Sequence, residues 1–80
     1  MLIPLARVAT AMHMNAALIT LALNQSGYHK DSVTSATFKG MLVNGIFVYD
    51  CAFYNNIEGR HEQCNVYIRF AHDGKIVADY

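Results

Sequence analysis

The sequence predicts an α+β fold, with one N-terminal helix packed on a four-stranded antiparallel β-meander in strand order 1-2-3-4. Apolar residues recur at helical spacing in the first 24 residues. Apolar and polar residues then alternate along segments that are separated by Gly-containing turn sequences. We expect one domain over residues 1–80, with a helix over about 4–24 and strands over about 34–43, 46–55, 63–71 and 75–80.

The predicted helix begins near Pro4 and ends before Gly27. Proline suits the first helical turn because its missing N–H has no partner there, and glycine suits the left-handed cap after the last turn. One apolar stripe is expected to face the sheet: Leu5, Val8, Met12, Ala16, Ile19 and Leu23. We expect a second stripe to extend the core, with contact to another molecule as the alternative: Met14, Leu18 and Leu21.

Asn44-Gly45 lies between two β-rich segments and predicts a two-residue hairpin. Both central positions of the type I′ turn need positive φ, which asparagine and glycine tolerate. The resulting register pairs Val43 with Ile46, Leu42 with Phe47, Met41 with Val48, Lys39 with Asp50 and Phe38 with Cys51. The opposite charges of Lys39 and Asp50 support this register.

His72-Asp73-Gly74 predicts a second hairpin, with a three-residue turn and glycine in the left-handed position. This turn places Phe70 opposite Ile76 and Ile68 opposite Ala78. The connection over residues 55–62 contains Gly59, and we align it so that the second and third strands share an inner face.

Strand alternation then divides the side chains between two faces of the sheet. The inner face, under the helix, collects Phe38, Leu42, Phe47, Tyr49, Cys51, Phe53, Val66, Ile68, Phe70, Ile76 and Ala78. The outer face is more apolar than a solvated face should be, with a charged rim around an apolar centre. We therefore predict a partner interface at Lys39, Met41, Val43, Ile46, Val48, Asp50, Tyr67 and Arg69.

Composition limits the classes of function. Six Lys and Arg balance six Asp and Glu, so the chain lacks the basic surface typical of nucleic-acid binders. Polar residues such as Arg7, His13 and Thr20 interrupt the apolar N-terminal segment, which fits neither a membrane span nor a secretory signal. We therefore expect a cytoplasmic chain whose two cysteines are reduced thiols.

A metal-dependent or thiol enzyme is the main alternative function. Zinc could be held by side chains of suitable type: Cys51, His61, Cys64 and either His72 or His29. The spacing opposes such a site because no Cys-x-x-Cys pair occurs, and buried cysteine commonly behaves as a small hydrophobic residue. A nucleophilic Cys51 would need a base in reach, yet the neighbouring Asp50 points to the opposite face. We therefore predict no catalytic residues, no metal and no cofactor.

Single-stranded nucleic-acid binding is a weaker alternative, since one sheet face could form a stacking platform with Tyr54, Tyr67, Arg69 and Lys39. Asp50 and Asp79 on the same face oppose it. In size, neutrality and absence of catalytic motifs, the chain resembles the heterogeneous class of small phage-borne inhibitors that includes anti-CRISPR proteins. We therefore predict a non-catalytic protein–protein interaction domain that binds or occludes a larger protein, with homodimerisation as a further expectation.

Overall fold

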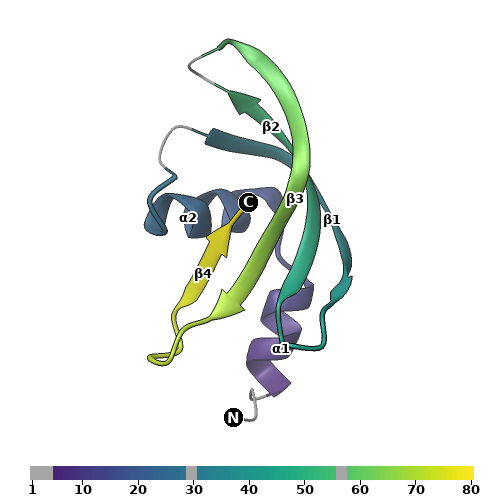
Figure 1. The fold of residues 1–80 in the computed structure, drawn as a ribbon, viewed down its shortest axis with the longest axis vertical. Coiled ribbons are helices and arrows are strands. Elements are labelled where there is room, and N and C mark those ends of the chain that lie inside the picture. The colour runs from purple at the N-terminus through teal and green to yellow at the C-terminus, as the bar shows by residue number, and fades with distance from the viewer. Residues whose placement is uncertain (1–4, 29–30, 56–57) are drawn as a thin grey trace.

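The computed structural model describes residues 5–28, 31–55 and 58–80. Two helices precede four antiparallel strands, which form one sheet in the order β1-β2-β3-β4 (Figure 1). This arrangement confirms the predicted α+β fold and strand order. The elements are α1 (Leu5–Met12), α2 (Ala16–Gln25), β1 (Asp31–Met41), β2 (Phe47–Asn55), β3 (Arg60–Phe70) and β4 (Ile76–Asp79).

The segment predicted as one helix forms two helices, separated by a break at residues 13–15. Asn15 has an extended backbone (φ −91°, ψ 175°), and its Oδ1 accepts a hydrogen bond from the Leu18 N–H at 2.9 Å. Asparagine is more favourable at an N-cap than inside a helix, because its side chain satisfies a backbone donor that the first turn leaves over. The single helix over about 4–24 is therefore corrected to two, and its predicted start at Pro4 lies outside the described residues.

The predicted glycine cap closes α2. Gly27 has a φ of 105°, and its N–H donates to the Asn24 carbonyl at 3.2 Å. The Tyr28 N–H donates to the Leu23 carbonyl at 2.9 Å. These two bonds form a Schellman motif, which needs a left-handed residue at the position of Gly27.

The Tyr49 hydroxyl ties the break between the helices to the sheet. It accepts a hydrogen bond from the Met14 N–H at 3.0 Å and donates one to the Ala11 carbonyl. The Tyr49 side chain is buried, and this burial raises the pKa of its hydroxyl. A single side chain of β2 thus satisfies two backbone groups that the end of α1 leaves without helical partners.

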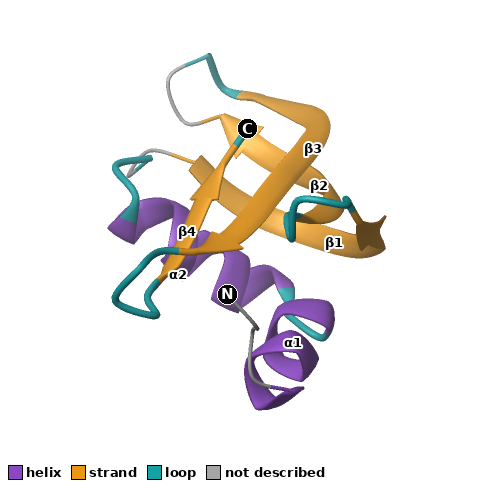
Figure 2. Cartoon of the chain, turned by 60° about the horizontal axis from the view of Figure 1, so that its bottom comes forward, coloured by secondary structure: helices purple, strands orange, loops and turns teal. Residues whose placement is uncertain are grey.

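Both helices lie on the same side of the sheet, as Figure 2 shows. Two hydroxyl groups of the α2 segment reach the two edge strands. The Thr20 Oγ1 accepts from the Val33 N–H of β1 at 2.9 Å, and the Ser26 Oγ accepts from the Ala78 N–H of β4 at 3.0 Å. Each bond covers a backbone donor that the edge of a sheet would otherwise leave exposed.

The first hairpin has a three-residue turn, so its predicted two-residue register is wrong. The Leu42 N–H donates to the Ile46 carbonyl at 2.8 Å, and the Gly45 N–H donates to the Leu42 carbonyl at 3.0 Å. Met41 therefore pairs with Phe47. Among the described residues only glycines have positive φ, so Asn44 cannot take the conformation of a type I′ turn. The geometry is that of a type I turn followed by Gly45 (φ 80°) in the left-handed position.

An irregularity in β1, between Phe38 and Gly40, shifts the register by one further residue. Lys39 is skipped there, Thr37 pairs with Asp50, and Phe38 pairs with Tyr49. The predicted pairing of Lys39 with Asp50 is therefore wrong as well. Because two one-residue shifts restore the alternation, Phe38 still shares the inner face with Tyr49.

The remaining register predictions are confirmed. Phe70 pairs with Ile76 and Ile68 with Ala78, and β2 pairs with β3 so that Cys51 lies opposite Cys64. The inner face and the helices build a core of buried side chains that includes Ile19, Leu23, Phe47, Tyr49, Cys51, Phe53, Val66, Ile68 and Ala78. Leu42 differs from its prediction, since its side chain is exposed.

Candidate protein-binding surface

The tip of the first hairpin exposes three consecutive apolar side chains. The exposed fractions of Met41, Leu42 and Val43, relative to reference values, are 58%, 46% and 109%. We call these three residues the first-hairpin tip. Burying a side chain of this size stabilises a protein or a complex by roughly 1.5–3 kcal/mol, so the tip is a strong candidate for contact with another molecule.

The apolar surface continues from the tip onto the outer face of the central strands. Val48 of β2 pairs with Tyr67 of β3 on one side and with Gly40 of β1 on the other. A side chain added at Gly40 would meet no atom within 4 Å, so the space beside this glycine is open. Across β3 and β4, Arg69 pairs with Val77 and supplies a charged margin.

The other half of the outer face is polar. The Gln63 Nε2 donates to both carboxylate oxygens of Asp50, at 3.1 Å each. Tyr54 and His61 pair across β2 and β3, with ring centroids 5.2 Å apart at 66°. The outer face is thus divided along the strands, and its apolar half is the one nearest the first-hairpin tip.

The corrected register redistributes the predicted interface residues. Outward positions are held by Ile46, Val48, Asp50, Tyr67 and Arg69. Met41 instead lies opposite the core residue Phe47, at the exposed end of the strand, while Val43 is in the turn and Lys39 is at the irregularity. The prediction missed Leu42 because an Asn-Gly pair was assigned to a two-residue turn. A signal was present in the sequence: if Asn44-Gly45 is given the same three-residue turn that is predicted for the second hairpin, Leu42 moves to the outer face.

The second apolar stripe of the predicted helix is divided by the break. Met14 is buried, in agreement with the expected core role. Leu18 and Leu21 are exposed on α2, so the core role is wrong for both. These two leucines add a separate apolar strip on the helix side of the molecule.

The residues of the alternative metal or thiol site fall on both faces of the sheet. Cys51 and Cys64 share the inner face, whereas His61 pairs with the outward-facing Tyr54. His29 lies outside the described residues. Among the residues that the structure describes, no three His, Cys, Asp or Glu side chains gather closely enough to hold a metal ion. Burial raises the pKa of the Cys51 thiol to about 12, which makes this thiol a weak nucleophile near neutral pH.

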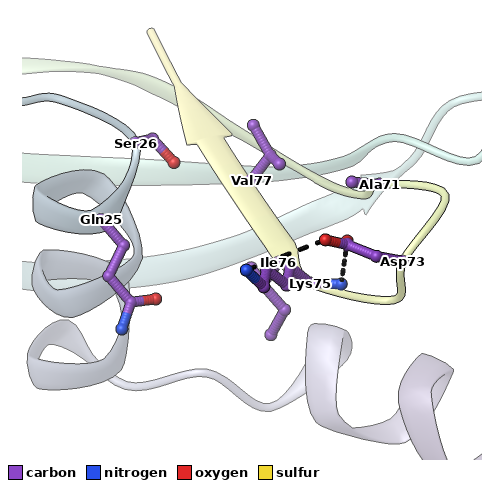
Figure 3. A pocket seen from close by; sticks show the side chains of 7 residues that line it. All are labelled: Gln25, Ser26, Ala71, Asp73, Lys75, Ile76 and Val77. Carbon is purple, nitrogen blue, oxygen red and sulfur yellow. Dashed lines mark hydrogen bonds and ion pairs between the residues drawn. The ribbon is translucent and has the colours of Figure 1, made fainter.

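An open pocket of about 680 Å³ lies between the end of α2 and the second hairpin. Figure 3 shows its lining: Gln25, Ser26, Ala71, Asp73, Lys75, Ile76 and Val77. Its charged groups pair with each other, with the Lys75 Nζ 3.8 Å from an Asp73 carboxylate oxygen. The Ser26 hydroxyl is engaged with the backbone of Ala78. The two charged groups and the hydroxyl that line the pocket are thus already engaged in contacts within the chain.

No protein-family model, curated protein or solved structure matches this chain significantly. Within the described ranges, neither helix is both long and apolar enough to cross a membrane. The first-hairpin tip is the feature of the described chain that bears most directly on function.

Proposed function

We propose that this chain is a small non-catalytic domain that binds a larger protein through the first-hairpin tip and the adjoining apolar outer face. The observation that carries the proposal is the full exposure of Val43, flanked by Met41 and Leu42. Binding through a protruding apolar tip and a half-buried sheet face would occlude the corresponding surface of the partner.

The backbone of the turn does not require an apolar tip, as the second hairpin demonstrates. Its Ala71 N–H donates to the Lys75 carbonyl at 2.9 Å, and its Gly74 N–H donates to the Ala71 carbonyl at 2.9 Å. The same turn is therefore made with His72 where the first hairpin has Val43. The turn geometry therefore does not determine the residue type at this position, and the apolar side chain of Val43 supports a role in binding.

The chemistry around the tip favours a protein partner with an apolar socket. Both charge signs occur in the vicinity, with Lys39 and Arg69 against Asp50 and Asp79, and the formal net charge is zero. An anionic membrane surface or a nucleic acid would instead be met by a concentration of Lys and Arg. A desolvated apolar centre with a mixed charged rim is the usual anatomy of protein–protein interfaces.

In its finer form, the proposal is an inhibitor carried by a phage or other mobile element, comparable to the anti-CRISPR class. Small size, neutrality and an uncovered apolar surface support this form. A second copy of the chain is the competing occupant of the same surface.

The test compares Val43→Asp with His72→Asp, which places the same charge at the equivalent position of the second hairpin. Both side chains are exposed, so we expect the stability of each variant to remain within about 0.5 kcal/mol of the wild type. Affinity capture from the native host identifies a partner, and calorimetry with the purified partner measures its affinity for each variant. Val43→Asp should lower the affinity roughly 100-fold, whereas His72→Asp should leave it unchanged.

Sedimentation of the isolated chain distinguishes the two occupants. A concentration-dependent dimer that Val43→Asp abolishes would assign the tip to a second copy. If Val43→Asp binds the purified partner as tightly as His72→Asp does, the tip is not the interface and the proposal fails.

A further inference from the structure

Among the described residues, the two cysteines form a pair of thiols that the proposed function does not use. Cys51 of β2 and Cys64 of β3 are directly opposite each other in the antiparallel register. Their side chains therefore project from the same face of the sheet, toward the helices. Both are reduced thiols in this structure.

Directly opposed residues of antiparallel strands have Cα atoms about 4.5 or 5.5 Å apart, depending on their place in the hydrogen-bond ladder. Disulfides span Cα separations of about 4.4–6.8 Å, so both kinds of position allow a bond. Opposed Cβ atoms lie about 4.5–5.5 Å apart, whereas a disulfide holds them at about 3.8 Å. A disulfide accepts Cβ separations up to about 4.5 Å, so the two ranges meet, and an external thiolate can open the bond by exchange.

The two thiols differ in access. Cys51 has no exposed surface, while Cys64 is only partly buried. Burial raises the pKa of Cys51 to about 12, so this thiol is a poor first target for an oxidant. Cys64 is therefore the thiol that meets a small oxidant from solution.

We propose that Cys51 and Cys64 form a modification site at which a hydroperoxide reversibly creates a disulfide between the two central strands. The Cys64 sulfur attacks one peroxide oxygen and the O–O bond breaks, which leaves a sulfenic acid on Cys64. The other peroxide oxygen takes the thiol proton and departs as an alcohol or water. The Cys51 sulfur then displaces the sulfenic oxygen, which departs as water with the thiol proton. The peroxide is reduced by two electrons, the two thiols are oxidised to the disulfide, and an external thiol reverses the change.

The experiment treats the full chain with hydrogen peroxide and follows intact mass and thiol labelling. Wild type should lose two hydrogen atoms in mass and both labelling sites without dimerising, and dithiothreitol should restore both. Cys51→Ser should stop at the sulfenic acid of Cys64, which dimedone traps. Cys64→Ser should leave Cys51 at least tenfold slower to react than Cys64 is in the wild type.

The matched control is the double variant Gln63→Cys/Cys64→Ser. It moves the thiol by one residue, onto the outer face opposite Ala52, and keeps nearly the same separation along the chain. This variant should form no intrachain bond while its circular dichroism remains that of the wild type. An intrachain bond formed equally fast in the control would overturn the proposal. So would a wild-type chain that yields only intermolecular bonds, higher oxidation of Cys64 or no reaction.

Discussion

The two tight hairpins share one turn geometry and differ in what they display. In both, glycine closes a three-residue loop with a φ near 80°, at Gly45 (80°) and Gly74 (83°). The first loop raises Val43 into solvent with Leu42 beside it, whereas the second displays His72 and the Asp73–Lys75 pair. In each hairpin, the equivalent turn positions make the backbone hydrogen bonds. The residue types at the other positions of the loop are therefore not determined by the turn.

The hairpins also differ in how they are attached to the helices. Behind the first, the Tyr49 hydroxyl holds two backbone groups at the break between α1 and α2. Behind the second, one hydrogen bond joins the Ser26 hydroxyl to Ala78. The Tyr49 hydroxyl thus makes two hydrogen bonds to the helix side where the Ser26 hydroxyl makes one to β4, and a rigid first hairpin would favour the binding proposed for its tip.

Exchanging the tips gives the largest expected effect. Leu42→Ala with Val43→His makes the first tip resemble the second, and it should weaken binding to the purified partner roughly 100- to 1,000-fold while leaving the fold intact. The reverse exchange, Ala71→Leu with His72→Val, should add no affinity, because the outer-face centre lies beside the first hairpin. Calorimetry measures both, and retained affinity in the first exchange would contradict the assignment.

Removing the two anchors tests the difference in attachment. Tyr49→Phe leaves the Met14 N–H and the Ala11 carbonyl without their buried partner, so we expect a loss of about 2–3 kcal/mol in the free energy of unfolding. Ser26→Ala removes one partly buried bond and should cost about 1 kcal/mol. Urea denaturation compares them, and equal losses would show that the anchors do not differ.

Alkaline pH should change the stability contributed by the Tyr49 hydroxyl and leave the contribution of the Ser26 hydroxyl unchanged. Burial raises the pKa of Tyr49 above its ordinary value of 10.0, so the folded state holds this proton more tightly than the unfolded state does. The resulting stability is fully present below pH 10 and is lost as the pH rises past the folded-state pKa. Tyr49→Phe should therefore lose less stability than the wild type above pH 10. Ser26→Ala should match the wild-type slope in the same denaturation series.

The two turn glycines should give matched losses of stability, and therefore the smallest difference between the two hairpins. Gly45→Ala and Gly74→Ala each force a side chain into the left-handed region, at a cost of about 1–2 kcal/mol. Because the turns share one geometry, the two losses should agree within about 0.5 kcal/mol. A clear difference in thermal unfolding would show that the turns are held differently in solution.

Much of the fold could be predicted because it depends on local patterns. The glycine cap at Gly27, the second hairpin at Gly74 and the inner-face set from Phe47 to Phe53 all follow from residue type and strand alternation. The break at Asn15 was hidden because an apolar helical repeat continues on both sides of it. Asn15 acts as an N-cap because the chain bends there, and this bend brings the Met14 N–H to the Tyr49 hydroxyl.

The candidate site depended more heavily on tertiary structure. An Asn-Gly pair is compatible with turns of two or three residues, and the choice between them exchanges Met41 and Leu42 between the faces. The irregularity at Lys39 then restores Phe38 to the core, which is a compensation that no local pattern encodes.

The sequence by itself determined the four strands, their order and the apolar character of residues 41–43, because these follow from propensity, turn chemistry and alternation. Tertiary structure decided which apolar side chains remain in solvent. Exposure depends on whether a side chain lies between the helices and the sheet, and only the folded chain decides that. For this reason Met14 became core, whereas Leu18, Leu21, Leu42 and Val43 did not.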